Sequence, residues 1–205
     1  MKIGVLGGSG FLGSHVCDLL SKSGHKVKIL DIKKSKYQKD NQTFLKTDIK
    51  KYKELEKNLH NIDVVFHFAG ASDLNQLLNM PLESAELNII GTLNVLQAMK
   101  KNKIGHIVYA STLYTFSRDG GFYRCSKQAS EEYIREFYKQ FKINYTILRF
   151  GSLYGPRSNS TNGMWRIVDS AINNSKIVYE GDPETRREYI HVIDAAEAAI
   201  NSLND

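Results

Sequence analysis

The stretch Gly7-Gly-Ser-Gly-Phe-Leu-Gly13 follows an apolar run, Ile3–Leu6, and opens a helical pattern that continues to Ser23. Glycines between a strand and a helix let the backbone approach a ligand closely, and the first amides of a helix have no partner within it. This combination is typical of a loop that binds the pyrophosphate of a dinucleotide; the alternative is a tight turn without a ligand. The predicted pyrophosphate contacts are Gly7, Gly10, Phe11 and Leu12.

Asp31 stands where a dinucleotide-binding fold needs an acidic residue, at the end of the next apolar run, Val27–Leu30. A carboxylate there accepts the hydroxyls of the adenine ribose and repels a 2′-phosphate, which favours NAD over NADP. Lys33 and Lys34 weaken this preference, because either lysine could neutralise a phosphate. The alternative is that both are solvated loop lysines.

Two residues at the end of a third apolar run are assigned to the adenine. Asp48 is predicted to accept the adenine amino group, and Ile49 to pack on the ring. For Asp48 the alternative is that its carboxylate caps the helix that follows near Tyr52.

Short β-rich runs alternate with longer helical patterns along the whole chain, which is typical of βαβ units. The predicted strands are Ile3–Leu6, Val27–Leu30, Phe44–Lys46, Val64–Phe68, His106–Ala110, Tyr145–Phe150 and Lys176–Tyr179. The predicted helices lie near Phe11–Ser23, Tyr52–Leu59, Leu82–Lys101, Phe122–Phe141, Gly163–Asn174 and Asp194–Leu203. Right-handed crossovers would wind these elements into an α/β fold with a doubly wound parallel sheet, the Rossmann fold.

A stretch rich in turn formers, Tyr154–Gly163, is the one break in composition. It predicts a dinucleotide-binding domain at residues 1–155 and a small substrate-binding region at residues 156–205. The final predicted helix carries a face of small residues at Ala195, Ala198 and Ala199, which indicates close packing. We expect this second region to be incomplete.

The composition is that of one globular α/β domain, with 205 residues of which 24% are charged and 41% hydrophobic. The net charge of +6 comes from scattered lysines, so no nucleic-acid partner is predicted. No run reaches the roughly 18 apolar residues of a membrane span, so no membrane contact is predicted.

The two cysteines, Cys17 and Cys125, fall in predicted helices and lack the spacing of metal ligands. They are interpreted as free thiols in a reducing compartment, and no metal site is expected. A first strand that starts at Lys2 leaves no room for a secretory signal. We therefore expect a cytoplasmic protein.

Tyr123-Arg-Cys-Ser-Lys127 places a phenol and an ammonium one helical turn apart. The cation can lower the pKa of the phenol, which makes an acid–base centre for moving a proton off a hydroxyl. Beside a dinucleotide such a centre supports hydride transfer. Taken alone, Tyr123 could instead be a surface tyrosine.

Taken in chain order, these motifs resemble those of the extended short-chain dehydrogenase/reductases, and more closely the NAD-dependent epimerase/dehydratase group acting on nucleotide sugars. The motifs that carry the resemblance are Gly7–Gly13, Asp31, Asp48-Ile49, His67-Phe-Ala-Gly70, Asn88-Ile-Ile-Gly-Thr92, Tyr123–Lys127, Leu148–Arg157 and Arg187–Asp194. The resemblance implies that Thr112 completes a catalytic set with Tyr123 and Lys127, with Ser111 as second choice. It also implies cofactor contacts at Phe68, Ala69, Gly70 and Asn88, and at Tyr123 and Lys127 themselves, whereas His67 is interpreted as a core histidine.

In this family the tyrosine takes a proton from a sugar hydroxyl while the carbon gives hydride to NAD. Lys127 and the positive nicotinamide are expected to favour the Tyr123 phenolate. The family's dehydratases and decarboxylases carry an acidic residue one or two places after the threonine, where this chain has Leu113 and Tyr114. The resemblance therefore favours a nucleotide-sugar epimerase with a transient keto sugar. The alternatives are a dehydratase or reductase of the family, a simple dehydrogenase, or a non-catalytic NAD-binding sensor or scaffold.

The resemblance assigns the substrate side to Ser152, where many relatives have an asparagine, and to Arg157 and Arg187, whose guanidinium groups match the oxygens of a diphosphate. Either arginine could instead form a surface ion pair. A homodimer is expected through the helices at Leu82–Lys101 and Phe122–Phe141, which in this family commonly pair. The second of these carries more apolar surface than one buried stripe needs, unless all of it packs on the sheet.

Overall fold

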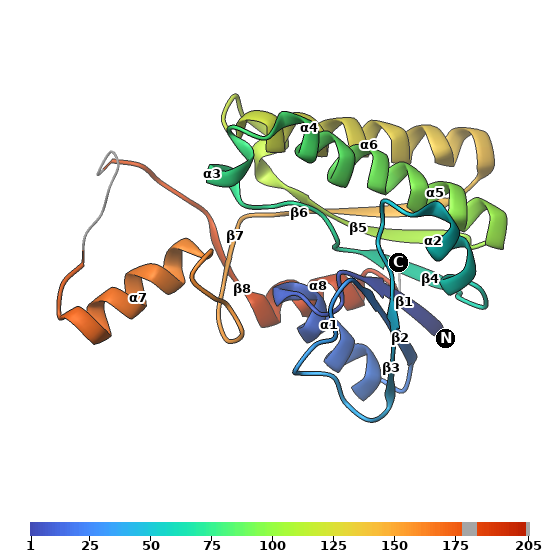
Figure 1. Ribbon diagram of the computed structural model, residues 1–205, viewed down its shortest axis with the longest axis horizontal. Helices are drawn as coiled ribbons and strands as arrows, with labels where there is room; N and C mark the ends of the chain where they lie inside the picture. Colours follow the sequence, from blue (N-terminus) through green and yellow to red (C-terminus); the bar gives the residue numbers. More distant parts are fainter. Residues whose placement is uncertain (178–183, 204–205) are drawn as a thin grey trace.

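A computed structural model describes residues 1–177 and 184–203. Its centre is a six-stranded sheet in the order β3-β2-β1-β4-β5-β6, with every neighbouring pair parallel. The strands are β1 Lys2–Leu6, β2 Lys26–Asp31, β3 Gln42–Lys46, β4 Val64–His67, β5 His106–Thr112 and β6 Asn144–Phe150 (Figure 1). The strand order reverses between β1 and β4, and in such sheets ligands bind at the carboxyl ends beside the reversal. The predicted doubly wound fold is confirmed.

Helices cover both faces of the sheet. Their bounds are α1 Phe11–Lys22, α2 Tyr52–Asn58, α3 Leu74–Leu77, α4 Pro81–Ser84, α5 Gly91–Asn102, α6 Gly121–Phe141, α7 Gly163–Asn174 and α8 Val192–Asn201. One apolar core joins α2, α5 and α6 to the sheet, and a second joins α1 and α8 to its other face. Figure 1 shows these two layers above and below the strands.

The predicted helix at Leu82–Lys101 has an interruption that the sequence did not indicate. A π-helical segment, η1 at Ala85–Ile90, lies between α4 and α5. It carries the buried Asn88 into the space between the sheet and α6. Such π-helical turns are often found at functional sites.

A separate pair of parallel strands lies beyond the main sheet. It consists of β7 Ser152–Tyr154 and β8 Tyr189–His191, and neither strand was predicted. The strand predicted at Lys176–Tyr179 is absent at Lys176 and Ile177, and its last two residues lie outside the described residues. Helix α7 projects from the body of the molecule (Figure 1), and none of its residues is buried.

Helix α8 packs on α1, although it belongs to the predicted second region. Its small residues Ala195, Ala196 and Ala199 are fully buried in the core that α1 shares, whereas Ala198, expected on the same face, is exposed. We therefore propose that α8 belongs with the dinucleotide-binding layer. Among residues 156–177 and 184–191, the rest of the predicted second region remains a substrate-side proposal.

Within the described residues, no helix has the length and apolar character that a membrane crossing requires.

Candidate active site

The glycine loop turns between β1 and α1 in a space that only glycine fits. Gly7 has φ +76°, and a Cβ there would lie 2.6 Å from the Ala69 nitrogen. A Cβ on Gly13 would lie 2.2 Å from the Gly7 carbonyl oxygen. These contacts bring the start of α1 tightly against β1 and against the loop after β4.

The start of α1 is suited to hold an anion. Gly10 is its N-cap and offers no side chain, and the first helical hydrogen bond runs from the Ser14 amide to the Gly10 carbonyl, 3.0 Å. The amides of the first turn, including those of Phe11 and Leu12, therefore have no partner within the helix. Such an end attracts phosphate through its amides and its dipole.

The Asp31 carboxylate lies beside this loop at the end of β2. It accepts hydrogen bonds from the Ser9 amide, 3.1 Å, and from the Lys33 amide, 3.3 Å. The side chains of Lys33 and Lys34 are exposed. The geometry agrees with a ribose-binding carboxylate flanked by solvated lysines.

Asp48 and Ile49 are placed less simply. The Asp48 carboxylate accepts a hydrogen bond from the Lys50 amide, 2.9 Å, but it does not cap α2, whose N-cap is Lys51 and has no side-chain cap. Ile49 is only 5% exposed, and a Cβ on Gly91 would lie 2.7 Å from its Cδ1 atom. Little of the Ile49 side chain is left to pack on an adenine ring.

Asn88 organises the loop that follows β4. Its Nδ2 donates to the Ala71 carbonyl, 3.0 Å, and to the Ser126 hydroxyl, 2.9 Å, while its Oδ1 accepts from the Ala71 amide, 2.9 Å. Gly70 has φ +157°, and a Cβ there would lie 2.6 Å from the Asn88 oxygen. Because both Asn88 amide hydrogens have protein partners, we propose that Asn88 positions Phe68–Gly70 and does not itself bind the cofactor.

His67 lies in the core as expected, with a ring nitrogen 3.1 Å from the Thr92 hydroxyl. Burial, and secondarily the charge of Lys127, lowers the pKa of His67 to about 3. It is therefore neutral at physiological pH and only a weak base, which agrees with a core histidine.

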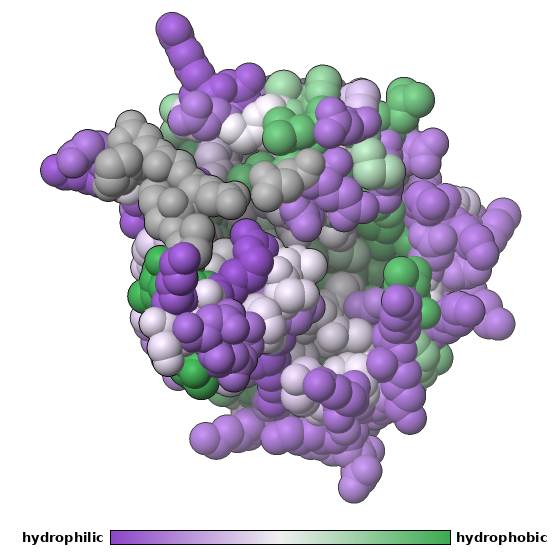
Figure 2. Space-filling view, turned by 60° about the vertical axis from the view of Figure 1, so that its left-hand side comes forward, coloured by the Kyte–Doolittle hydropathy of each residue, from purple (hydrophilic) through white to green (hydrophobic). Residues whose placement is uncertain are grey.

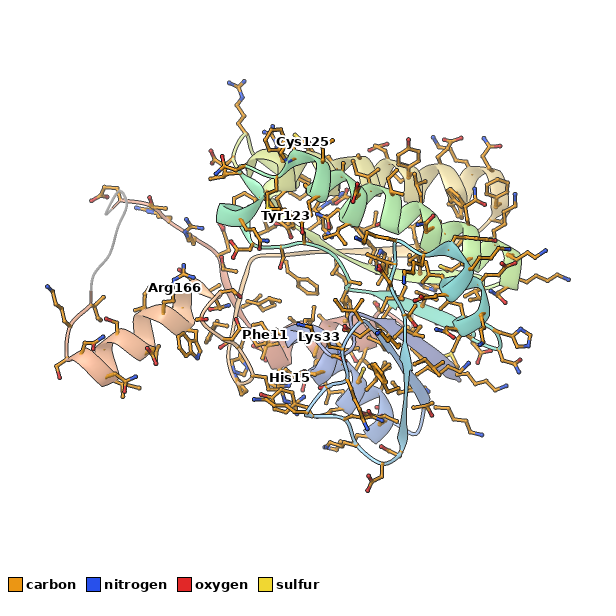
Figure 3. The ribbon with its side chains drawn as sticks, viewed as in Figure 1. Phe11, His15, Lys33, Tyr123, Cys125 and Arg166 are labelled. Carbon is orange, nitrogen blue, oxygen red and sulfur yellow. The ribbon has the colours of Figure 1, made fainter. Side chains whose placement is uncertain are left out.

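The structure brings together the three predicted catalytic residues. Thr112 ends β5, and Tyr123 and Lys127 lie one turn apart on α6. The Thr112 hydroxyl accepts from the Tyr114 amide, 3.3 Å, and lies near enough to the Tyr123 phenol to lower its pKa. Lys127 is 8% exposed, with its Nζ 4.2 Å from the centre of the Tyr109 ring. Figure 3 shows Tyr123 on α6 and Phe11 at the start of α1, both at the same end of the sheet.

Burial and charge oppose each other at the catalytic residues. Burial raises the pKa of Tyr123, and Lys127 and the nearby Thr112 hydroxyl lower it only in part. For Lys127, burial lowers the pKa, but the phenols of Tyr109 and Tyr123 and the Glu131 carboxylate raise it above its ordinary value. Lys127 therefore acts in the expected direction without bringing the pKa of Tyr123 below its usual range. A further positive charge is needed to favour the phenolate.

On the substrate side, Arg187 reaches toward the catalytic residues. Its Nη1 donates to the Tyr114 hydroxyl, 3.1 Å, and the Tyr114 ring meets the Tyr123 ring edge to face at 6.5 Å. Ser152 lies on β7, where its amide donates to the Glu188 carbonyl, 2.8 Å. In the sequence, Tyr114 was informative only because it is not acidic. Its contact with Arg187 could not be predicted, because it joins segments far apart in the chain.

Arg157 is placed differently from Arg187. Its Nη2 donates to the Asp18 carboxylate on α1, 2.6 Å, and its guanidinium lies 4.4 Å from the centre of the Tyr37 ring. The neighbouring Pro156 carbonyl accepts from the His15 ring nitrogen, 2.9 Å. This favours the ion-pair alternative for Arg157, which fastens the loop after β7 to α1.

Comparison with known proteins places this geometry in a family. The sequence model of the NAD dependent epimerase/dehydratase family matches residues 3–205. A protein assigned as a UDP-glucose 4-epimerase in Methanocaldococcus jannaschii is 30% identical over 223 residues, covering 98% of this chain and 72% of that protein. A UDP-N-acetyl-alpha-D-glucosaminuronate decarboxylase of Bacillus cytotoxicus is 28% identical over 227 residues, covering 98% and 70%.

The fold similarity is also high to a solved relative. The crystal structure of the UDP-glucose 4-epimerase of Thermotoga maritima with UDP-glucose superposes with a TM-score of 0.91 at 27% identity. The superposition covers 99% of this chain and 73% of that one. The relatives that match this chain thus include proteins assigned different reactions, an epimerase and a decarboxylase.

Proposed function

This chain belongs to the NAD-dependent epimerase/dehydratase family, and from that premise we propose that it is a nucleotide-sugar epimerase working through a transient keto sugar. NAD is its cofactor. The observation that carries the proposal is the set formed by Thr112, Tyr123 and Lys127, with no carboxylate at the two positions after Thr112. Tyr114 occupies the second of those positions and directs its hydroxyl to Arg187. Elimination or decarboxylation would need an acidic group there, as the resemblance to family members implies.

The residues at the carboxyl edge of the sheet fit a dinucleotide. The uncapped first turn of α1 would hold the pyrophosphate, and Asp31 would accept the ribose hydroxyls. Gly7, which admits no side chain, lets the loop after β4 pack directly against the glycine loop. Bound NAD supplies a hydride acceptor and a positive ring.

Proton transfer falls to the chain's own side chains. Tyr123 would take the proton of the sugar hydroxyl and return it after the hydride comes back to the other face of the keto sugar. Thr112 would hold the reacting oxygen close to the phenol, within hydrogen-bond reach. Lys127 stays charged because its pKa is raised, so it opposes the effect of burial on Tyr123.

Product analysis tests this proposal directly. NAD-loaded protein would be incubated with UDP-, GDP-, CDP- and dTDP-sugars, and the products resolved by proton NMR and mass spectrometry. An epimer of unchanged mass supports the proposal. A product that has lost water or carbon dioxide, or NADH released in proportion to substrate, contradicts it. Tyr123→Phe serves as the inactive control.

We also propose that the enzyme is a homodimer. On α6, Ile134 and Phe137 pack in the core, but Tyr133 and Phe141 remain well exposed. Leu82, on the neighbouring α4, is 79% exposed. Figure 2 shows hydrophobic residues among hydrophilic ones along the upper edge of the molecule, where α4 and α6 lie. Light scattering that gives a monomer mass at micromolar concentration would contradict the dimer.

We place the enzyme in the cytoplasm. The support is that both cysteines are free, with Cys17 buried and Cys125 exposed. Burial raises the pKa of the Cys17 thiol, so it is unreactive. An exposed free thiol such as Cys125 is best kept in a reducing compartment.

A further inference from the structure

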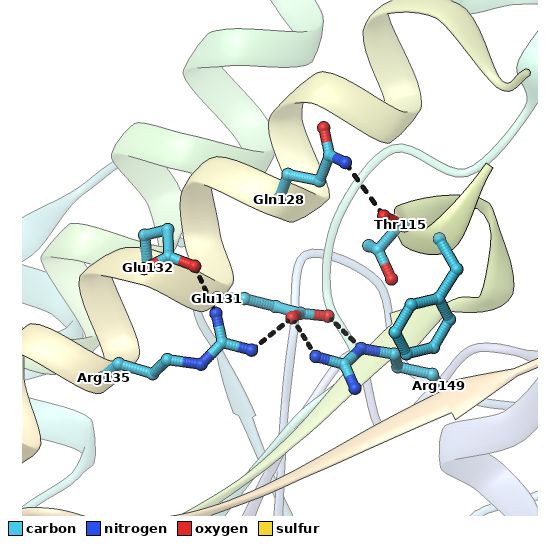
Figure 4. Close-up of a pocket in the computed structure, with 7 residues that line it drawn as sticks. Thr115, Gln128, Glu131, Glu132, Arg135 and Arg149 are labelled. Carbon is cyan, nitrogen blue, oxygen red and sulfur yellow. Dashed lines mark hydrogen bonds and ion pairs between the residues drawn. The ribbon is translucent and has the colours of Figure 1, made fainter. Parts of the chain in front are cut away.

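Glu131 is a buried carboxylate one helical turn beyond Lys127 on α6, and only 3% of it is exposed. Ser111 Oγ donates to its Oε1 at 2.6 Å, and Arg149 donates to both of its oxygens, Nε at 2.9 Å and Nη2 at 2.5 Å. Arg135 Nη2 donates to Oε2 at 2.9 Å (Figure 4). One carboxylate therefore ties together β5, β6 and α6.

Its partners keep Glu131 ionised. Burial raises the pKa of Glu131, but the hydrogen bonds from Arg149 and Ser111 outweigh burial and hold the pKa below its usual range. The guanidinium of Arg149 meets the carboxylate in the bidentate geometry that gives both strength and fixed orientation. The contact is thus a permanent tie across physiological pH.

The contacts of Glu131 extend to the residue of β5 that precedes Thr112. Ser111 directly precedes Thr112 on β5, and in the β5–β6 register Ser111 pairs with Arg149. Ser111, our second choice for catalysis, donates to Glu131, whereas Thr112 lies beside Tyr123, which is on the same helix as Glu131.

A second set of contacts fastens the turn after Thr112 to the same helix. This turn is the 3₁₀ helix η2, Leu113–Phe116. Gln128 Nε2 donates to the Thr115 carbonyl at 2.9 Å, and the Phe116 ring lies 4.5 Å from the Arg149 guanidinium. These residues surround Glu131 at a pocket of about 290 Å³, shown in Figure 4.

We propose that Glu131 is a positioning residue that locks the carboxyl end of β5 to α6, so that Thr112, Tyr123 and Lys127 keep one reactive geometry. The inference rests on the proposed function, since it concerns the same catalytic set. A buried ion pair adds little net stability over apolar side chains of the same size, so its role here is better read as fixing geometry. Misplacing a reacting group by about 1 Å can cost about 100-fold in rate.

The test compares two neighbouring glutamates in NAD-loaded protein. Glu131→Gln removes the charge that joins the three elements. Glu132→Gln removes the same charge next door, where the side chain is mostly exposed and pairs only with Arg135 among the described residues. We expect Glu131→Gln to lower kcat about 30-fold, with KM and the NAD dissociation constant within about twofold. Glu132→Gln should leave all three unchanged.

Equal kcat in the two variants would overturn the inference, and so would a loss in Glu131→Gln shared equally by kcat, KM and NAD binding. Should Glu131→Gln fail to fold, Ser111→Ala decides, with kcat expected about fivefold lower at unchanged KM. An unchanged kcat in that variant would overturn the inference. Wild-type protein that converts no sugar nucleotide overturns the proposed function and this inference together, whereas an active wild type with an unaffected Glu131→Gln overturns the inference alone.

Discussion

The glycine loop at residues 7–13 is held by backbone packing, whereas the corner formed by Thr112, Tyr123 and Lys127 is held by side-chain contacts and charge. In the loop, added Cβ atoms on Gly7 and Gly13 would meet backbone atoms that cannot move aside. In the corner, burial and charge oppose each other at Tyr123 and at Lys127. Steric contacts therefore fix the glycine loop, which has no room for a larger side chain. In the corner, a balance of burial and charge sets the pKa values of Tyr123 and Lys127, and this balance can be shifted.

The largest effect is expected in the electrostatic corner. Tyr123→Phe removes the group that we propose takes the sugar proton, so kcat should fall about 1,000-fold. NAD affinity should stay nearly constant, because the ring and the helix remain. Quenched turnover assays measure kcat, and equilibrium titration with NAD measures the NAD affinity. Tyr133→Phe, an exposed position on the same helix, is the matched control, and equal activity of Tyr123→Phe and wild type would refute the catalytic assignment.

Next in size is a change in the steric region. Gly13→Ala would place a Cβ 2.2 Å from the Gly7 carbonyl, so the free energy of unfolding should fall by about 3 kcal/mol and NAD binding should be lost. Gly105→Ala is the control, because a Cβ there meets nothing within 4 Å. Urea unfolding of both variants compares them. If the Gly13 variant unfolds at the same urea concentration as the Gly105 variant, backbone packing does not hold the loop.

The two regions also differ in how far sequence predicts them. The glycine loop, Asp31 and the Tyr123–Lys127 pair are local patterns, and the structure brings each to the carboxyl edge of the sheet. The six main strands were predicted because each is an apolar run bounded by turn formers. The three-residue strands β7 and β8 were missed, because so short a segment shows no periodicity and pairs with a distant partner.

The features of the site that the sequence left open or did not indicate have a common cause, which is contact between distant segments. Arg157 pairs with Asp18 on the first helix, and no local pattern indicates that partner. The net pKa of Tyr123 depends on its burial under the folded chain, so the spacing to Lys127 gave the direction of one contribution only. Glu131 carries no motif in the sequence, and its role emerges from three elements that meet in space.

A buried histidine between the regions gives a pH-dependent prediction. The pKa of His67 is about 3 in the folded protein, below the ordinary value of 6.5. The folded state therefore binds fewer protons than the unfolded chain below pH 6.5, and stability is lost as the pH falls from there toward 3. At pH 5 the loss from this group should be about 2 kcal/mol.

His67→Asn should flatten that part of the pH profile, measured as the free energy of unfolding between pH 7 and pH 5. The control is His60→Asn, at an exposed position. A slope in the His67 variant as steep as in the wild type would show that other groups cause the acid loss.

The smallest effect concerns the Asp31 carboxylate, which lies beside the glycine loop. It accepts the Ser9 and Lys33 amides and is placed to accept the ribose hydroxyls. Asp31→Asn keeps an acceptor oxygen for the amides but removes the charge, so NAD binding should weaken by about 1.5 kcal/mol. Binding of NADP should change little or improve, because the repulsion of a 2′-phosphate is gone. Titration of wild type and variant with both dinucleotides gives the ratio of affinities, and Asp40→Asn, at an exposed position, is the control. If wild-type protein binds NADP as tightly as NAD, Asp31 does not select NAD over NADP. Lys33 and Lys34 would then be the residues that determine the selectivity.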